Sequence, residues 1–173
     1  MNGKTVITSS NNPQIKNLAL LQKKAKARNE QGLFVVEGIK MFEEARREGL
    51  LLKAYMSESF YAEKTKTPEF FNGLIYEIVS DALFRQITDT MTPQGIMGTV
   101  KKPVYAFEDL LKAKDAFLLL LEDIRDPGNL GTIIRTAEGA GVTGIVLNRS
   151  CADILQPKVV RSTMGSIFRV PYY

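Results

Sequence analysis

The chain has 173 residues, a formal net charge of +4 at pH 7, 45% hydrophobic and 24% charged residues, a composition typical of a globular protein. It holds no histidine and one cysteine, which excludes a Ser-His or Cys-His catalytic pair, an internal disulfide and a cysteine-rich zinc site, so we expect no metal. The longest apolar run, Ala116 to Leu121, is far shorter than the roughly 20 residues of a membrane helix, and with no signal-peptide core and a single cysteine we expect the cytoplasm and no membrane partner.

Basic residues gather toward both ends of the chain. Residues 1–29 hold six basic residues and no acid, residues 30–126 hold 12 basic and 17 acidic residues, and residues 127–173 hold five basic and two acidic residues. Clustered cations attract nucleic-acid phosphates, although a solvated lysine surface gives the same pattern. The candidate phosphate contacts near the N-terminus are Lys16, Lys23, Lys24 and Arg28.

The first 100 residues alternate between helical and extended patterns. Asn12-Pro13 predicts the start of a helix that ends at Gly32, and Ser80 predicts the cap of another helix that runs to about Ile87. Further helices are predicted at 39–48 and 58–64, loops at 66–73 and 88–95, and four strands at 33–38, 50–56, 74–79 and 96–100. Such an alternation predicts a complete small α/β domain.

A second pattern follows Lys101-Lys102-Pro103, which is the predicted domain boundary. A short helix from Glu108 to about Ala113 precedes an unbroken apolar run at 117–121, which predicts a parallel strand buried on both faces. A helix from about Leu130 to Ala140 and a strand at 144–147 complete a predicted βαβ unit. Pro157 predicts the start of one more helix.

The most informative motif is the segment from Asp126 to Gly141, which follows the predicted strand and opens a helix. Open α/β sheets bind ligands at this position, and the first N–H groups of a helix attract anions. Gly128 permits a sharp turn, and Asn129 is a candidate helix cap. Arg135 lies off the apolar face of this helix, and the alternative to a functional role is a solvated pair with Glu138.

The other patterns in the sequence are less informative about function. A G-x-G-x-x-G pattern at Gly139 closes a helix, whereas a dinucleotide fingerprint opens one, and the sequence has no phosphate-binding G-x-x-x-x-G-K-[ST] loop that would favour a nucleotide enzyme. Lys158 and Arg161 fall on one face of the last predicted helix, as exposed cations or as phosphate contacts. Cys151 has no neighbour that would activate it, so we expect a small, at least half-buried residue.

Two stretches of the second half resemble a known family. LEDIRDPGNLGTIIRTAEGAGVTGIVL (121–147) is similar to the first motif of the SpoU (TrmH) family of RNA ribose 2′-O-methyltransferases, of the SPOUT superfamily, and KVVRSTMGSIFRVP (158–171) is similar to the stretch that follows it. In the first half, ITSSNNPQIKNL (7–18), TMTPQGIMG (90–98) and the pattern Arg28, Gly32, Phe34, Glu37, Gly38 resemble the family's RNA substrate-binding domain, which is similar to kink-turn-binding ribosomal proteins.

The resemblance implies an RNA substrate-binding domain at 1–100, a linker with a short helix at 101–113, and the N-terminal part of a SPOUT methyltransferase domain at 114–173. It implies 2′-O-methylation of ribose in RNA, with S-adenosylmethionine as cofactor, ribosomal RNA as the expected partner and a homodimer as the assembly of the whole protein. It places the key arginine at Arg135 and its companion at Asn129. Lys158 and Arg161 are further candidate RNA contacts because of their place on one helical face, and not because of the resemblance. We interpret Arg135 as a charged clamp, because a guanidinium does not give up its proton.

The family's two further motifs, which form its trefoil knot and bind the cofactor, have no match in the chain. We therefore expect an N-terminal piece of a longer enzyme, inactive alone and without tight binding of S-adenosylmethionine. The alternative is a non-catalytic RNA-binding module with a vestigial methyltransferase domain.

Overall fold

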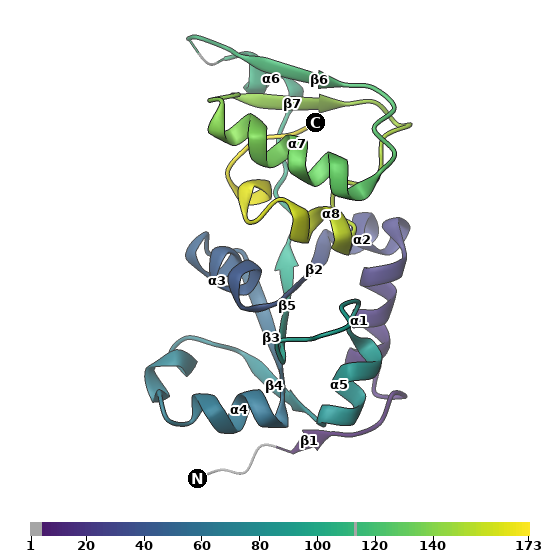
Figure 1. Cartoon of the computed structure of the whole chain (residues 1–173), viewed down its shortest axis with the longest axis vertical. Coiled ribbons are helices and arrows are strands. Elements are labelled where there is room, and N and C mark those ends of the chain that lie inside the picture. The colour runs from purple at the N-terminus through teal and green to yellow at the C-terminus, as the bar shows by residue number, and fades with distance from the viewer. Residues whose placement is uncertain (1–4, 113) are drawn as a thin grey trace. The chain divides into compact units, whose positions relative to one another are not determined.

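The computed structural model describes residues 5–112 and 114–173. The chain divides into two compact units, Met1–Lys101 and Lys102–Tyr173. Each unit combines helices with strands (Figure 1), so the predicted α/β class is confirmed. None of the helices in the described residues has the length and apolar character needed to cross a membrane.

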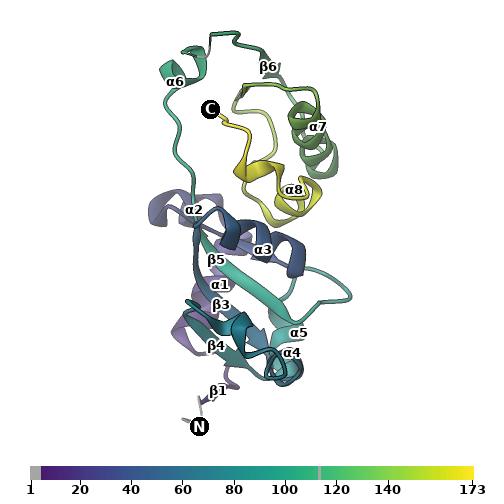
Figure 2. The ribbon, with the colours of Figure 1, turned by 90° about the vertical axis from the view of Figure 1, so that its left-hand side faces the viewer.

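The first unit is built on a five-stranded sheet with the strand order β1-β4-β3-β5-β2. The strands are β1 (Val6–Ile7), β2 (Leu33–Glu37), β3 (Leu51–Ser57), β4 (Tyr76–Val79) and β5 (Ile96–Lys101). Strands β1, β4 and β3 run parallel, and β5 runs antiparallel to both of its neighbours (Figure 2). The sequence predicts four of these strands and misses β1, because two residues are too few to show an alternating pattern.

Helices cover both faces of this sheet. They are α1 (Pro13–Lys23), α2 (Ala25–Gln31), α3 (Ile39–Arg47), α4 (Glu58–Lys64), the 3₁₀ helix η1 (Pro68–Phe71), inside a segment predicted as a loop, and α5 (Asp81–Ile87). One core includes Leu18 of α1 and Phe84 of α5, and the other includes Phe42 of α3. Because successive strand residues point to opposite faces, Tyr55 enters the first core and Met56 the second.

The single helix predicted from Pro13 to Gly32 is wrong, because the chain breaks at Lys24 into α1 and α2. Lys24 has an extended backbone, with φ −123° and ψ 112°. The guanidinium of Arg28 donates hydrogen bonds to the carbonyl oxygens of Leu21 and Gln22, at 2.6 and 3.0 Å. These carbonyls belong to the last turn of α1 and have no helical partner, so Arg28 caps the C-terminal end of that helix.

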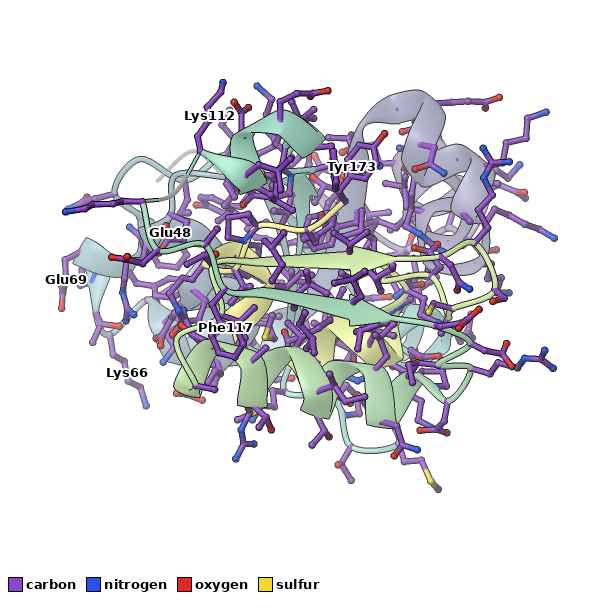
Figure 3. All side chains as sticks on the ribbon, turned by 90° about the horizontal axis from the view of Figure 1, so that it is seen from above. Glu48, Lys66, Glu69, Lys112, Phe117 and Tyr173 are labelled. Carbon is purple, nitrogen blue, oxygen red and sulfur yellow. The ribbon has the colours of Figure 1, made fainter. Side chains whose placement is uncertain are left out.

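The second unit contains the predicted βαβ arrangement. Strands β6 (Leu118–Leu121) and β7 (Gly144–Leu147) are parallel, and α7 (Pro127–Gly139) connects them. Figure 3 shows α7 lying along these two strands. On the other side of β7, the Tyr173 N–H donates to the Ile145 oxygen at 2.9 Å, which extends the sheet by the last residues. The remaining elements are α6 (Phe107–Leu111), α8 (Pro157–Ser162) and the 3₁₀ helix η2 (Ser166–Phe168).

The end of the short helix and the burial of β6 differ from the predictions. The short helix ends at Leu111, and its predicted end at Ala113 lies outside the described residues. The prediction that both faces of the Phe117–Leu121 strand are buried is wrong: Leu121 is 8% exposed, but Leu120, on the opposite face, is 73% exposed. An apolar run indicates a strand that can be covered on both faces, yet the described part of this unit covers only one face of β6.

Helices α7 and α8 pack closely at Gly131. A Cβ atom at this position would lie 2.7 Å from the Val159 oxygen and would collide with Ser162. We expect Gly131→Ala to destabilise the second unit by about 1–3 kcal/mol, the range for overpacking, because alanine forces the helices apart. Gly139→Ala in the same helix meets nothing within 4 Å and is the control. Urea unfolding followed by hydrogen exchange of α7 measures both, and equal stabilities would contradict the close contact.

Candidate active site at the start of α7

The candidate site lies where β6 and β7 end. The carboxyl ends of parallel strands meet at one edge, so the loops that follow these strands lie together. The Ala152 N–H donates to the Ile124 oxygen at 2.8 Å, and the Asn148 N–H donates to the Leu121 oxygen at 3.1 Å. Cys151 is half-buried, as predicted, and its Sγ accepts the Ile124 N–H at 3.4 Å. The loop after β7 therefore fixes the loop that leads into α7.

The residue that caps α7 is Asp126. Its Oδ1 accepts the backbone N–H of Asn129 at 2.7 Å, and Pro127 occupies the first helical position. The prediction that Asn129 caps the helix is wrong, because the helix begins three residues earlier than its apolar pattern. The side chain of Asn129 instead lies exposed on the first turn of α7.

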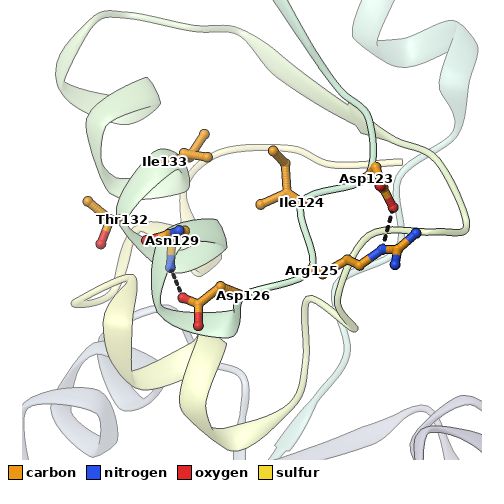
Figure 4. Close-up of a pocket in the computed structure, with 7 residues that line it drawn as sticks. All are labelled: Asp123, Ile124, Arg125, Asp126, Asn129, Thr132 and Ile133. Carbon is orange, nitrogen blue, oxygen red and sulfur yellow. Dashed lines mark hydrogen bonds and ion pairs between the residues drawn. The ribbon is translucent and has the colours of Figure 1, made fainter.

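An open hollow of about 350 Å³ lies beside this first turn (Figure 4). Within it, the Nε of Arg125 donates to Asp123 Oδ1 at 2.7 Å. Asp123 has a positive φ of 56°, and its N–H donates to Asn148 Oδ1 at 3.2 Å. Sequence reasoning misses Asp123 and Arg125, and the only signal for them is their place in a loop that follows a strand. The lining residues are Asp123, Ile124, Arg125, Asp126, Asn129, Thr132 and Ile133.

Arg135 does not line this hollow. It lies six positions after Asn129, which places the two side chains about 120° apart around the helix and about 9 Å apart along its axis. Helical spacing puts Arg135 on the face of Gly131 and Glu138, which contact α8 and η2. Its side chain is exposed and forms no hydrogen bond or ion pair with the residues that the structure describes. The two catalytic candidates thus share a helix but not a surface.

Glu138 has other partners than Arg135. Its carboxylate accepts hydrogen bonds from Ser166 Oγ at 2.5 Å, from Arg169 Nη2 at 3.1 Å and from Arg169 Nε. The surface pair of Arg135 with Glu138, which the sequence leaves open, is therefore wrong. The reason is that Arg169, 31 positions later in the chain, folds back onto α7 and occupies that carboxylate.

These contacts make the stability of the second unit depend on pH. The pKa of Glu138 lies below its usual value of 4.5, chiefly because Arg169 donates to the carboxylate, while partial burial opposes the shift. A lowered folded-state pKa means that the carboxylate stabilises the fold fully above the unfolded-state pKa, and that this contribution is lost as the pH falls through the folded-state pKa. We expect the wild type to exceed Glu138→Gln in stability at pH 7 and the difference to shrink below about pH 4. Urea unfolding across this range tests it, and a constant difference would contradict it.

The candidate RNA contacts differ in exposure. Lys16 and Lys23, two helical turns apart on α1, are exposed, and so is Lys24 at the break. Arg28 is only 4% exposed, so its place among the phosphate contacts is corrected: its guanidinium is used by the end of α1. Of the other N-terminal cations, Lys4 lies outside the described residues. On α8, Lys158 is exposed and Arg161 is half-buried.

The two halves of the chain match two family models. Residues 12–98 match the MRM3-like substrate binding domain, and residues 116–173 match the SpoU rRNA Methylase family. The human protein named rRNA methyltransferase 3, mitochondrial, is 34% identical over 83% of this chain and 35% of its own length. The 23S rRNA (guanosine(2553)-2′-O)-methyltransferase RlmP of Bacillus subtilis is 34% identical over 95% of this chain and 63% of its own length. The chain thus spans between about a third and somewhat under two thirds of these relatives.

A solved structure is similar as well. The AdoMet-bound rRNA methyltransferase from Sinorhizobium meliloti superposes with a TM-score of 0.78 and 32% sequence identity, over 97% of this chain and 63% of that chain. Both halves of the chain take part in this likeness, which agrees with the two family models. The chain therefore belongs to the SpoU (TrmH) family of RNA methyltransferases, as the resemblance of its motifs implies.

Proposed function

We propose that the whole protein transfers a methyl group from S-adenosylmethionine to a ribose 2′-hydroxyl of ribosomal RNA. The observation that carries the proposal is the exposed Arg135 on α7, the helix that follows β6; Asn129 is exposed on the first turn of the same helix, on another surface. The names of the relatives support the substrate, because they are ribosomal RNA methyltransferases and one of them is a 2′-O-methyltransferase. A homodimer and a cytoplasmic location stay predictions.

Arg135 is the proposed clamp for the reacting nucleotide. A 2′-hydroxyl is a weak acid, so its attack on a methyl group gains from a positive charge that stabilises the developing alkoxide. The side chain of Arg135 is exposed, and a guanidinium can form two parallel hydrogen bonds to a phosphate. Lys158 and Arg161 lie on α8, which packs against α7, so they are proposed to bind neighbouring phosphates. Asn129 is proposed to hydrogen-bond near the reacting group from the first turn.

S-adenosylmethionine is the proposed methyl donor, and the AdoMet-bound relative supports it. The hollow beside α7 gives no ground for placing this molecule there, because it is open and its lining combines two carboxylates, Asp123 and Asp126, with the guanidinium of Arg125. We therefore assign no cofactor contact to the described residues and derive no step through the cofactor.

The exposed lysines of α1 and of the break that follows it, Lys16, Lys23 and Lys24, are proposed to bind RNA phosphates. Each phosphate contact that is lost reduces the slope of log K against log salt concentration by roughly 0.7–0.9. We expect the combined change Lys16→Ala, Lys23→Ala and Lys24→Ala to reduce the slope for structured rRNA fragments by about 2–3. Lys66→Ala, an exposed lysine of the same unit beside η1, is the control and should leave the slope unchanged. An unchanged slope in the triple variant would remove this surface from the proposal.

Methyl transfer from isotope-labelled S-adenosylmethionine to ribosomal RNA tests the proposed reaction. A ribose that carries a 2′-O-methyl group cannot be cleaved by alkali at the adjoining phosphodiester, because the attacking hydroxyl is blocked. We expect the label in alkali-resistant dinucleotides after digestion of the RNA. Label that appears in single nucleotides would show methylation of a base and would contradict the proposal.

A further inference from the structure

We propose that Arg169 is a positioning residue for methyl transfer: by holding the carboxylate of Glu138, it keeps the guanidinium of Arg135 available for the RNA. The inference rests on the proposed function, because Arg135 is the clamp proposed there. It goes beyond that function because it gives a task in the reaction to a residue that acts through Glu138.

Glu138 is the carboxylate of α7 that is placed to compete with RNA for Arg135. It is the one acidic residue of this helix. Residues three positions apart on a helix have Cβ atoms about 5–6 Å from each other, so an arginine and a glutamate at this spacing commonly pair. The side chain of Arg135 is exposed and can turn toward such a neighbour. A guanidinium that is paired in this way has fewer donors left for a phosphate.

The structure gives this carboxylate other partners. Its Oε1 accepts from Arg169 Nε, and its Oε2 accepts from Arg169 Nη2 at 3.1 Å and from Ser166 Oγ at 2.5 Å. Two N–H donors of one guanidinium on the two oxygens fix the orientation of the carboxylate. The side chains of Arg169 and Glu138 are only 34% and 32% exposed, so water screens this pair less than a pair on the open surface. Arg135 in turn forms no hydrogen bond or ion pair within the described part of the chain.

The ion pair also neutralises a negative charge close to Arg135. The pKa of Glu138 lies below its usual value, chiefly because Arg169 donates to the carboxylate, so this group is ionised at neutral pH. Without a partner, it would attract the guanidinium of Arg135 and repel a phosphate bound there. The charged residues of α8, which packs on this face of α7, are the cations Lys158 and Arg161. Loss of Arg169 therefore leaves an uncompensated carboxylate next to the proposed clamp.

Single-turnover methyl transfer by the whole protein, at RNA concentrations below saturation, tests this role. We expect Arg169→Gln to slow the reaction by about three- to tenfold, because an exposed ion pair and a nearby repulsion each change an equilibrium by only a few-fold. Adding Glu138→Gln removes the competitor and should restore the rate to within about twofold of the wild type. Arg169→Lys keeps a cation beside Glu138 and should lose less than Arg169→Gln.

Two variants separate positioning from a purely structural role. Glu138→Gln alone breaks the ion pair but leaves nothing to compete for Arg135, so its rate per folded molecule should stay near that of the wild type. Lys112→Gln removes an exposed cation of the same unit and is the control for the loss of one charge. A loss in Glu138→Gln as large as that in Arg169→Gln would show that the network serves only the fold. A double variant as slow as Arg169→Gln would show that Arg169 itself binds RNA, and either result would overturn the proposal.

The pKa of Glu138 in the 173-residue chain tests the pairing without RNA. NMR of the carboxyl carbon follows the titration. Arg169→Gln should raise the pKa, since Arg169 is the largest cause of its lowered value. Adding Arg135→Gln should raise it again in that background and leave it nearly unchanged in the wild type, because Arg135 becomes a partner only when Arg169 is absent. Equal effects of Arg135→Gln in both backgrounds would contradict the exchange of partners.

The two measurements separate this inference from the proposed function. Equal rates of the wild type and Arg169→Gln would overturn the positioning role and leave the proposed function intact. Absence of 2′-O-methyl transfer by the wild type would overturn the proposed function and, with it, the role of Arg169 in the reaction. The titration decides in either case whether Arg169 keeps Glu138 from Arg135.

Discussion

Replacing Arg135 by alanine is expected to slow methyl transfer by the whole protein by about 10²–10³-fold, the effect of removing one preorganised electrostatic donor. The side chain is exposed and bonds no described residue, so its loss removes a contact to the reacting nucleotide without opening the core. Arg135→Lys should recover little of the rate, because an ammonium cannot bind a phosphate through two parallel bonds.

The stability of these variants is the control. Exposed substitutions away from caps and cores change the free energy of unfolding by less than about 0.5 kcal/mol, so both variants should fold as the wild type does. Single-turnover methyl transfer with saturating S-adenosylmethionine measures the chemical step. A near-normal rate in Arg135→Ala would place the chemistry elsewhere.

Replacing Arg28 by methionine is expected to destabilise the first unit by about 1.5–3 kcal/mol, the range for hydrogen bonds to a charged group. Methionine fills a similar volume but leaves the oxygens of Leu21 and Gln22 without their buried donor. Hydrogen exchange of peptides from α1 and β2, read against urea concentration, measures the loss.

The matched control is Lys26→Met in the same helix. The side chain of Lys26 is 85% exposed and pairs only loosely with Glu30 at 3.7 Å, so its loss should cost under about 0.5 kcal/mol. If Arg28→Met were as stable as Lys26→Met but bound RNA poorly, Arg28 would return to the list of phosphate contacts.

Local signals in the sequence predict much of the fold. Asn12 and Ser80 cap α1 and α5 as their types suggest, since an N-cap bond joins residues two or three apart. The break at Lys24 escapes prediction, because neither glycine nor proline marks it and the arginine that stabilises it follows four residues later. Strand β1 is not predicted either, since it has two residues and is recognised by its pairing with β4.

The sequence predicts where the candidate site lies in the chain, but it does not predict how the residues of the site are arranged. The loop before α7 is found from its motif, but the cap proves to be Asp126 and the hollow depends on Asp123, whose orientation comes from Asn148 in another loop. The contact of Glu138 with Arg169 joins residues 31 positions apart, which no helical periodicity reveals. Sequence patterns indicate contacts between residues that lie within a few positions of each other. Contacts between residues far apart in the sequence form only when the chain has folded, so these patterns do not reveal them.

The place of β5 in the sheet has a consequence for synthesis of the chain. This last strand of the first unit lies between β3 and β2, and within residues 5–112 and 114–173 β2 pairs with no other strand. Phe34 of β2 lies opposite Val100, so this pairing closes a long loop, and such contacts form slowly. A ribosome adds about 5–20 residues per second, so β2 waits several seconds for its partner to be made. During that interval Phe34 and Val36 have not reached their buried positions in the folded unit. The growing chain is then most prone to aggregate and to bind chaperones.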